Sequence, residues 1–157
     1  MDASAISQII FLIILLIFSA FFSSAETALT TVNKIRMRTL ADDGNKRAER
    51  VLRITDDSHK MLSAILIGNN IVNLSASSLA TTLAIKLWGS VGAGIATGIL
   101  TFLILVFGEI SPKTFATLYA DQISIAYSGI IGFLMKILTP VIFLVNQFSM
   151  GFLFLLH

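Results

Sequence analysis

Three long apolar runs dominate the first 112 positions of this chain. They cover about 6–28, 61–87 and 91–112, and each is long enough for a helix to cross a hydrocarbon core about 30 Å thick. The first run holds no charged residue before Glu26. A cleavable signal peptide does not fit it, because the preceding residues include Asp2 and neither Lys nor Arg. The pattern therefore predicts three transmembrane helices.

The polar stretch between the first two runs has the composition of short surface helices. Good helix formers fill Lys34–Ala41 and Lys46–Thr55, and Asp42–Asn45 is typical of a turn between them. Both segments also carry apolar side chains that can face a membrane surface. We expect paired helices over about 34–55 on the inner membrane surface, and a plain solvated loop is the alternative interpretation.

The last apolar run, about 123–156, fits poorly as a single span. Lys136 lies near its middle, and a lysine at the bilayer centre costs at least ~2.5 kcal/mol on insertion scales. The pair Thr139-Pro140 also interrupts helical hydrogen bonding. We expect two juxtamembrane helices, about 123–138 and 140–155, that lie like a belt at the inner interface. A fourth span is the alternative, and it would place the C-terminus outside.

Composition and charge narrow the class of protein to an all-α membrane protein in contact with lipid. Of the 157 residues, 55% are apolar, 13% are charged and none is Cys, and the mean hydropathy is +0.88. These values exclude a disordered tail, a disulfide-stapled module and an ordinary soluble domain. Eight of the eleven Lys and Arg lie in 34–60, which indicates a cytoplasmic membrane face and no nucleic-acid partner. The N-terminus is then outside and the C-terminus cytoplasmic.

Each predicted span carries polar side chains that a simple anchor does not need. Ser19 and Ser23 are four residues apart and share a helix face, and Asn69 and Asn73 do the same. Glu109 is the acid that lies deepest in an apolar run, and an intramembrane carboxylate indicates function. Helix packing explains any single serine equally well. Together, the five side chains offer hard oxygen ligands, which suit Mg²⁺, Ca²⁺ or Na⁺ better than a soft transition metal.

Backbone groups can add to these ligands. Pro112 has no N–H, so it frees the carbonyl of Gly108, and Gly68 permits close backbone approach. Interrupted helices of this kind bind ions at membrane depth in transporters. Gly94 and Gly98 form a small-residue step that suits helix contact, including a homodimer seam. The sequence has no ordered Ser-His-Asp set and no phosphate-binding glycine loop, so we expect no enzyme activity.

Three segments resemble the transmembrane motifs of the CorC/CNNM magnesium transporters. Ser19–Leu29, with the sequence SAFFSSAETAL, is similar to the first-helix motif of that family. Leu66–Asn73, LIGNNIVN, resembles the second-helix motif, and Phe107–Lys113, FGEISPK, resembles the third. The resemblance implies one transmembrane domain over 1–157 in a bacterial inner membrane, with three spans per subunit and a juxtamembrane belt. It also implies a homodimer, and a downstream cytoplasmic CBS-pair region that this chain lacks.

The resemblance also implies the function and the site. Dehydrated Mg²⁺ would be held by the side chains of Ser19, Ser23, Asn69, Asn73 and Glu109, with carbonyls near Gly68 and Gly108. Glu26, where members of the family vary, is peripheral. The expected function is Mg²⁺ transport, with export as the preferred direction and Na⁺ as the candidate coupling ion. The alternative is a membrane anchor and dimerisation module for a cytoplasmic regulatory domain, which has no reason to bring these side chains together.

Overall fold

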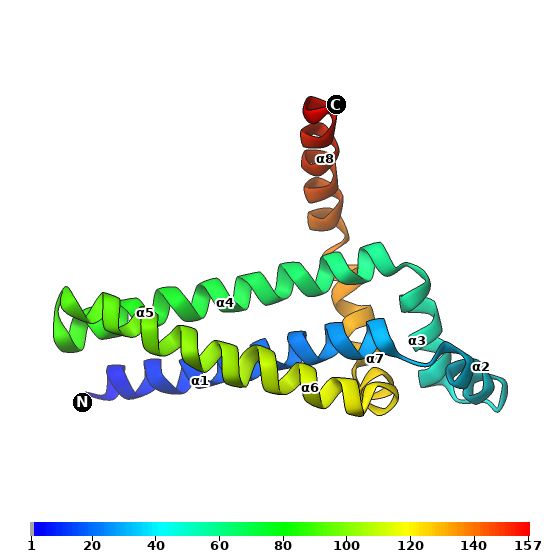
Figure 1. The fold of residues 1–157 in the computed structure, drawn as a ribbon, viewed down its shortest axis with the longest axis horizontal. Coiled ribbons are helices and arrows are strands. Elements are labelled where there is room, and N and C mark those ends of the chain that lie inside the picture. Colours follow the sequence, from blue (N-terminus) through cyan, green and yellow to red (C-terminus); the bar gives the residue numbers. More distant parts are fainter. Residues whose placement is uncertain (1) are drawn as a thin grey trace.

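The computed structural model describes residues 2–157 as a bundle of helices with short connections (Figure 1). Three long rods lie side by side, and the third is continuous through a π-helical segment. The rods are α1 (Ala3–Thr31), α4 (Ser58–Trp88) and the succession α5 (Val91–Leu103), η1 (Ile104–Ile110) and α6 (Ser111–Leu118). The shorter elements are α2 (Lys34–Asp42), α3 (Lys46–Asp56), α7 (Ala120–Ile137) and α8 (Thr139–Leu156). Residues 2–157 contain no strand, which confirms the all-α prediction.

Short polar residues define where the first helices begin. Asp2, Asn33, Asn45 and Asp57 each accept a hydrogen bond from a backbone N–H in the turn that follows. Gly89 ends α4 with a φ of 75°, which residues with a Cβ rarely adopt, and it turns the chain into α5. Helices thus fill the polar stretch on both sides of its turn, whereas their placement on a membrane surface stays a prediction.

A polar contact joins two rods at the end that carries the N-terminus and Trp88, called here the Trp88 end. Lys86 Nζ lies 3.6 Å from Asp2 Oδ2 and donates to Ser4 Oγ at 3.4 Å. The Ala5 N–H that donates to Asp2 Oδ1, together with the Lys86 ammonium, holds the pKa of Asp2 below its usual range. Both charged side chains are exposed, so the ion pair adds little to stability.

The opposite end, where α3 and α7 lie, is called here the α3 end, and it holds the main core (Figure 1). Ala25 and Ala64 are fully buried, and their small size lets α1 and α4 approach closely. Met37 from α2, Val51 from α3 and Ile131 from α7 are buried in the same cluster. The short helices are therefore packed against the rods and form one unit with them.

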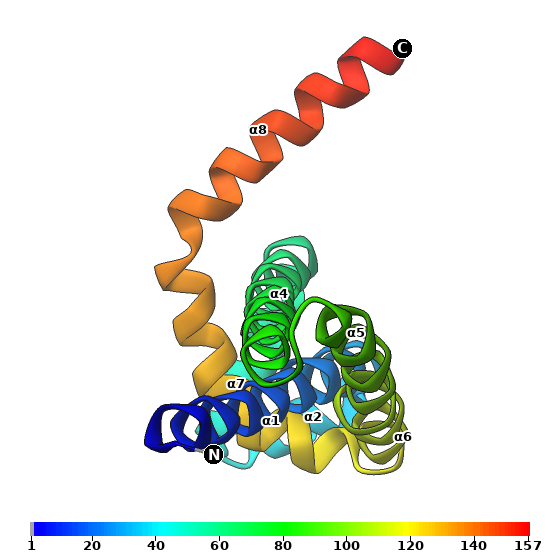
Figure 2. The same cartoon turned by 90° about the vertical axis from the view of Figure 1, so that its left-hand side faces the viewer.

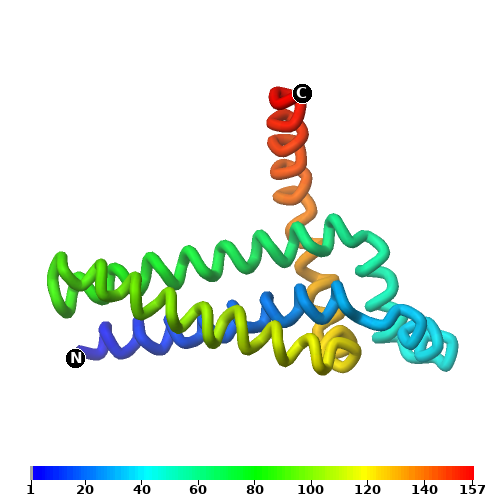
Figure 3. The backbone as a smooth tube through the Cα atoms, in the orientation of Figure 1, coloured from blue at the N-terminus to red at the C-terminus, as the bar shows by residue number. Residues whose placement is uncertain are grey.

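The helices α7 and α8 run across the rods. Seen along the rods, α7 lies beside α1, and α8 leads away from the bundle (Figure 2). The backbone trace shows the same change of direction between α7 and α8 (Figure 3), at Leu138. Most of α8 is exposed and apolar. It is held to the bundle through the buried Ile142 and through Asn146, whose Oδ1 lies 3.1 Å from His59 Nε2.

Four helical segments of the described chain are long and apolar enough to cross a membrane. They are α1, α4, the rod Val91–Leu118 and α8. The third rod extends beyond the predicted end at 112, because Pro112 lies in the first turn of α6 and is compatible with a helix there. Length and composition alone admit α8 as a span, so the count of three spans stays a prediction.

Candidate cation site

The third rod departs from α-helical geometry within the FGEISPK segment. The seven residues of η1 are π-helical, and the N–H of Ser111 donates to the carbonyl of Val106, five residues earlier. Pro112 follows directly and has no N–H to offer to this ladder. π-helical segments are rare and are frequently found at functional sites. Pro112 in the sequence predicted an interruption here, but not its π-helical form.

Gly108 brings this segment against α1. A Cβ on Gly108 would lie 2.8 Å from Ser19 Oγ, closer than side chains pack, so only glycine fits without a shift. Gly108 is buried, and Ser19 is 1% exposed. The backbone of η1 therefore lies directly against the first serine of the predicted site.

Gly68 makes the corresponding close approach between α4 and α1. A Cβ on Gly68 would lie 2.5 Å from Phe22 Cζ, so the ring of the buried Phe22 fills the space that a side chain would need. Phe22 precedes Ser23 in the chain, and Gly68 precedes Asn69. The two glycines thus position α1 between α4 and η1, with a predicted ligand next to each contact.

The predicted ligands hold buried oxygen atoms without hydrogen-bond partners. The described residues contain six buried side-chain N or O atoms of this kind, and four of them are Ser19 Oγ, Ser23 Oγ, Asn69 Oδ1 and Asn73 Oδ1. An unpaired buried polar atom costs about 1–3 kcal/mol, so such a concentration needs an explanation. Oxygen atoms that are already free of protein partners can bind a cation without breaking a protein hydrogen bond.

Glu109 is engaged by a neighbouring cation in this structure. Its Oε2 lies 3.3 Å from Lys113 Nζ, one helical turn later. The Glu109 side chain is 25% exposed and that of Lys113 is 42% exposed. A bound metal ion would therefore compete with Lys113 for the carboxylate. This pairing was not predicted from the sequence.

Apart from Glu109, the predicted ligands carry no formal charge. No group of three or more His, Cys, Asp or Glu that could hold a metal occurs among residues 2–157. The donor set is two hydroxyls, two amides and one carboxylate, which are hard oxygen ligands. Glu26, expected to be peripheral, is partly buried on α1. This chemistry can hold a hard cation with one compensating charge, which favours reversible binding.

Ser124 is a further unpaired hydroxyl that sequence reasoning missed. It lies on α7, is fully buried, and its Oγ has no partner among the described residues. Ser128, four residues later, donates from Oγ to the carbonyl of Ile125 at 3.1 Å. The Ser124–Ser128 spacing equals that of Ser19 and Ser23, so the signal was present in a segment interpreted only as a belt.

Comparisons with known proteins agree with the motifs. Residues 10–156 match the family described as cyclin M transmembrane N-terminal domain. A "UPF0053 protein" of Haemophilus influenzae is 45% identical over 150 residues, which cover 95% of this chain and 36% of that protein. The "UPF0053 inner membrane protein YfjD" of Escherichia coli is 41% identical over 83% of this chain and 31% of its own. A chloroplastic "DUF21 domain-containing protein" of Arabidopsis thaliana is 38% identical over 93% of this chain and 22% of its own. The chain thus spans about a third or less of the length of these relatives.

Proposed function

The chain belongs to the cyclin M transmembrane N-terminal domain family, and from this premise we propose that it carries Mg²⁺ across a membrane. The ion would bind between α1, α4 and η1. Its ligands would be Ser19, Ser23, Asn69, Asn73 and Glu109, with carbonyls near Gly68 and Gly108. The observation that carries the proposal is that four of these side chains hold buried, unpaired oxygen atoms.

The proposed site suits the coordination chemistry of Mg²⁺. This ion takes oxygen ligands at about 2.0–2.1 Å and loses its water reluctantly, so replacement ligands must be ready in place. The serine and asparagine oxygens have no hydrogen bond that must break before they bind the ion. Glu109 supplies the one negative charge and would exchange Lys113 for the ion. The π-helical segment that contains Glu109 is the part of the rod that can rearrange as this exchange occurs.

The proposed topology places three rods across the membrane. In it, α1, α4 and α5–α6 span the bilayer, α2 and α3 lie on the inner surface, and α7 with α8 forms the belt. The direction of α7 and α8 across the rods supports this arrangement (Figure 2). The proposed membrane is the bacterial inner membrane, to which the name of the Escherichia coli relative assigns that protein. The N-terminus is outside and the C-terminus is cytoplasmic.

The proposed assembly is a homodimer of a single transmembrane domain over 1–157, followed in the whole protein by a CBS-pair region. Gly94 and Gly98 lie on an open face of α5, where no atom of another described helix comes within 4 Å of a Cβ built on either, and this face suits a second copy. Export with Na⁺ as the coupling ion is the proposed direction of transport.

Flux measurements on matched variants test the proposal. The chain is reconstituted in liposomes that contain a Mg²⁺-sensitive dye, and Asn73→Leu is compared with Asn70→Leu. Asn73 holds an unpaired buried oxygen, whereas Asn70 is exposed three residues earlier on the same helix. Asn73→Leu should abolish the flux and Asn70→Leu should preserve it. Equal flux in both variants, or none in the unmodified chain, would favour the anchor and dimerisation module.

A further inference from the structure

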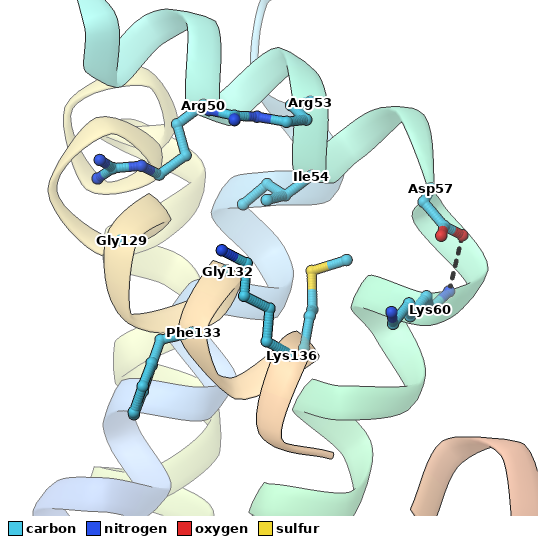
Figure 4. Close-up of a pocket in the computed structure, with 10 residues that line it drawn as sticks. Arg50, Arg53, Ile54, Asp57, Lys60, Gly129, Gly132, Phe133 and Lys136 are labelled. Atoms are coloured by element: carbon cyan, nitrogen blue, oxygen red, sulfur yellow. Dashed lines mark hydrogen bonds between the residues drawn. The ribbon is translucent and has the colours of Figure 1, made fainter. Parts of the chain in front are cut away.

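A basic cleft lies away from the cation site, where α3, α7 and the first turn of α4 meet (Figure 4). Its volume is about 470 Å³. The charged side chains that line it are Arg50 and Arg53 from α3, Lys60 from α4, Lys136 from α7, and Asp57 at the start of α4. Three elements that are distant in sequence thus bring four cations and one carboxylate to the same cleft.

The positive charges in this cleft are not balanced within the described chain. None of the four cations belongs to an ion pair in residues 2–157. Asp57 is the one carboxylate, and its Oδ1 accepts a hydrogen bond from the Lys60 backbone N–H at 3.4 Å as the cap of α4 (Figure 4). With one carboxylate among four cations, the lining of the cleft keeps an excess of positive charge, so the arrangement favours an anionic ligand.

Part of the lining of the cleft is apolar. Ile54, Phe133 and Met135 line it, and Phe133 is 62% exposed. Ile130 and Ile137 on the same helix are each 52% exposed. A small inorganic anion gains nothing from such a surface, whereas a ligand with both a charged and an apolar part is complementary to it.

We propose that this cleft binds the phosphate group of an anionic phospholipid, with the acyl chains against the exposed apolar face of α7. The cleft lies at the α3 end, among the basic residues that mark the inner membrane surface, and basic pockets at that depth bind lipid headgroups. Bound lipid would neutralise the repulsion and hold α3, α4 and α7 together. The proposal uses the orientation given above but does not depend on the cation site.

Native mass spectrometry of the detergent-purified chain tests this proposal. The chain is titrated with phosphatidylglycerol and with phosphatidylcholine of identical acyl chains. Phosphatidylglycerol should bind about tenfold more tightly, and this preference should shrink as salt is raised. Equal binding of the two lipids at low salt would overturn the proposal.

A pair of charge-matched variants locates the binding. Arg53→Gln with Lys136→Gln removes two cations from the cleft, and Lys46→Gln with Arg47→Gln removes two exposed cations that do not line it. The first pair should lower phosphatidylglycerol affinity about tenfold and the second less than about twofold. Arg53 and Lys136 are exposed, so their replacement leaves the core intact, and circular dichroism checks the fold. Equal loss in both pairs would show unspecific attraction and would overturn the proposal.

A third arm separates a lipid headgroup from a free anion. Inorganic phosphate and ATP are added to the lipid-bound chain. The lipid should remain bound at millimolar phosphate, because its apolar part adds to the affinity. Complete displacement of the lipid by either soluble anion would overturn the lipid proposal. The Asn73→Leu variant should keep its lipid binding, so failure of the cation site and failure of this cleft are distinguishable.

Discussion

Glu109 and Lys113 together decide how strongly the proposed site attracts Mg²⁺. The carboxylate is the one formal charge among the proposed ligands, and it lies 3.3 Å from the Lys113 ammonium. Both side chains are partly exposed, so their pairing contributes only about 0.3–0.5 kcal/mol to folding. The pair therefore matters less for stability than for the competition between the Lys113 ammonium and the proposed Mg²⁺.

We predict opposite effects for the two members of this pair. Glu109→Gln should weaken Mg²⁺ binding at least about tenfold, because neutral oxygens replace the water of Mg²⁺ poorly. Lys113→Met should strengthen it about threefold, because it removes a competitor and a repulsive charge. Isothermal titration measures both affinities. The effect of Lys113→Met should vanish in the Glu109→Gln background, and an undiminished effect there would mean that the lysine acts elsewhere.

At the residue scale, the sequence indicated which side chains share a helix face but not what each one faces. Ser19 with Ser23 and Asn69 with Asn73 followed from their spacing of four, and all four hold buried unpaired oxygens. The contact of Ser19 with Gly108 and the unpaired hydroxyl of Ser124 depend on how the helices pack. Spacing along one helix contains no information about the rotation of its neighbour, so these contacts required the structure.

At the scale of the elements, the close contact between η1 and α1 is the feature that sequence patterns predicted least. A π-helical segment has one extra residue in its turn, and such segments are rare within α-helices. Pro112 explains why the α-helical ladder fails nearby, but it does not fix where η1 begins. The break between α7 and α8 has a simpler local origin in Thr139-Pro140 and forms at Leu138.

We predict that Gly108→Ala destabilises the bundle by about 1–3 kcal/mol, since it over-packs a tight contact. The added Cβ would lie 2.8 Å from Ser19 Oγ and 3.4 Å from Ser19 Cβ. Ser19→Ala removes the nearer atom, so the double variant should recover part of the loss. Chemical denaturation in detergent gives the three free energies of unfolding. Strict additivity of the two changes would show that the contact between η1 and α1 is not tight.

At the scale of the whole molecule, the position of α8 relative to the membrane distinguishes the three-span topology from the four-span topology. The helix is long and apolar enough to span, yet it runs across the rods and is mostly exposed. The segments that became rods were evident from apolar length, because a span must cross a fixed thickness. The placement of α8 was not evident from the sequence. An apolar helix can have the same sequence pattern in a bilayer, at its surface or against a second subunit.

Cysteine labelling should resolve this topology. The chain has no natural Cys, so each introduced one is unique. Lys46→Cys and His157→Cys should react with an impermeant thiol reagent only from the cytoplasmic side, and Trp88→Cys only from outside. All three positions are exposed, so none is hidden by the protein itself. Labelling of position 157 from outside would establish the four-span topology and remove the belt.

Mg²⁺ should hold the whole domain in one state of an alternating-access cycle. The proposed ligands lie on three elements, and the π-helical segment η1 around Gly108 is the one that departs from α-helical geometry, since α1 and α4 are continuous α-helices. An ion that contacts all three in one arrangement and fewer in another favours the first by its differential affinity.

Hydrogen exchange with and without Mg²⁺ measures this, and protection should rise around Ser23, Asn73 and Glu109 more than at the Trp88 end. Asn73→Leu, which lacks one ligand, should lose the difference. A change of equal size at both ends, or no change at either, would indicate a static structural ion and would favour the anchor over the transporter.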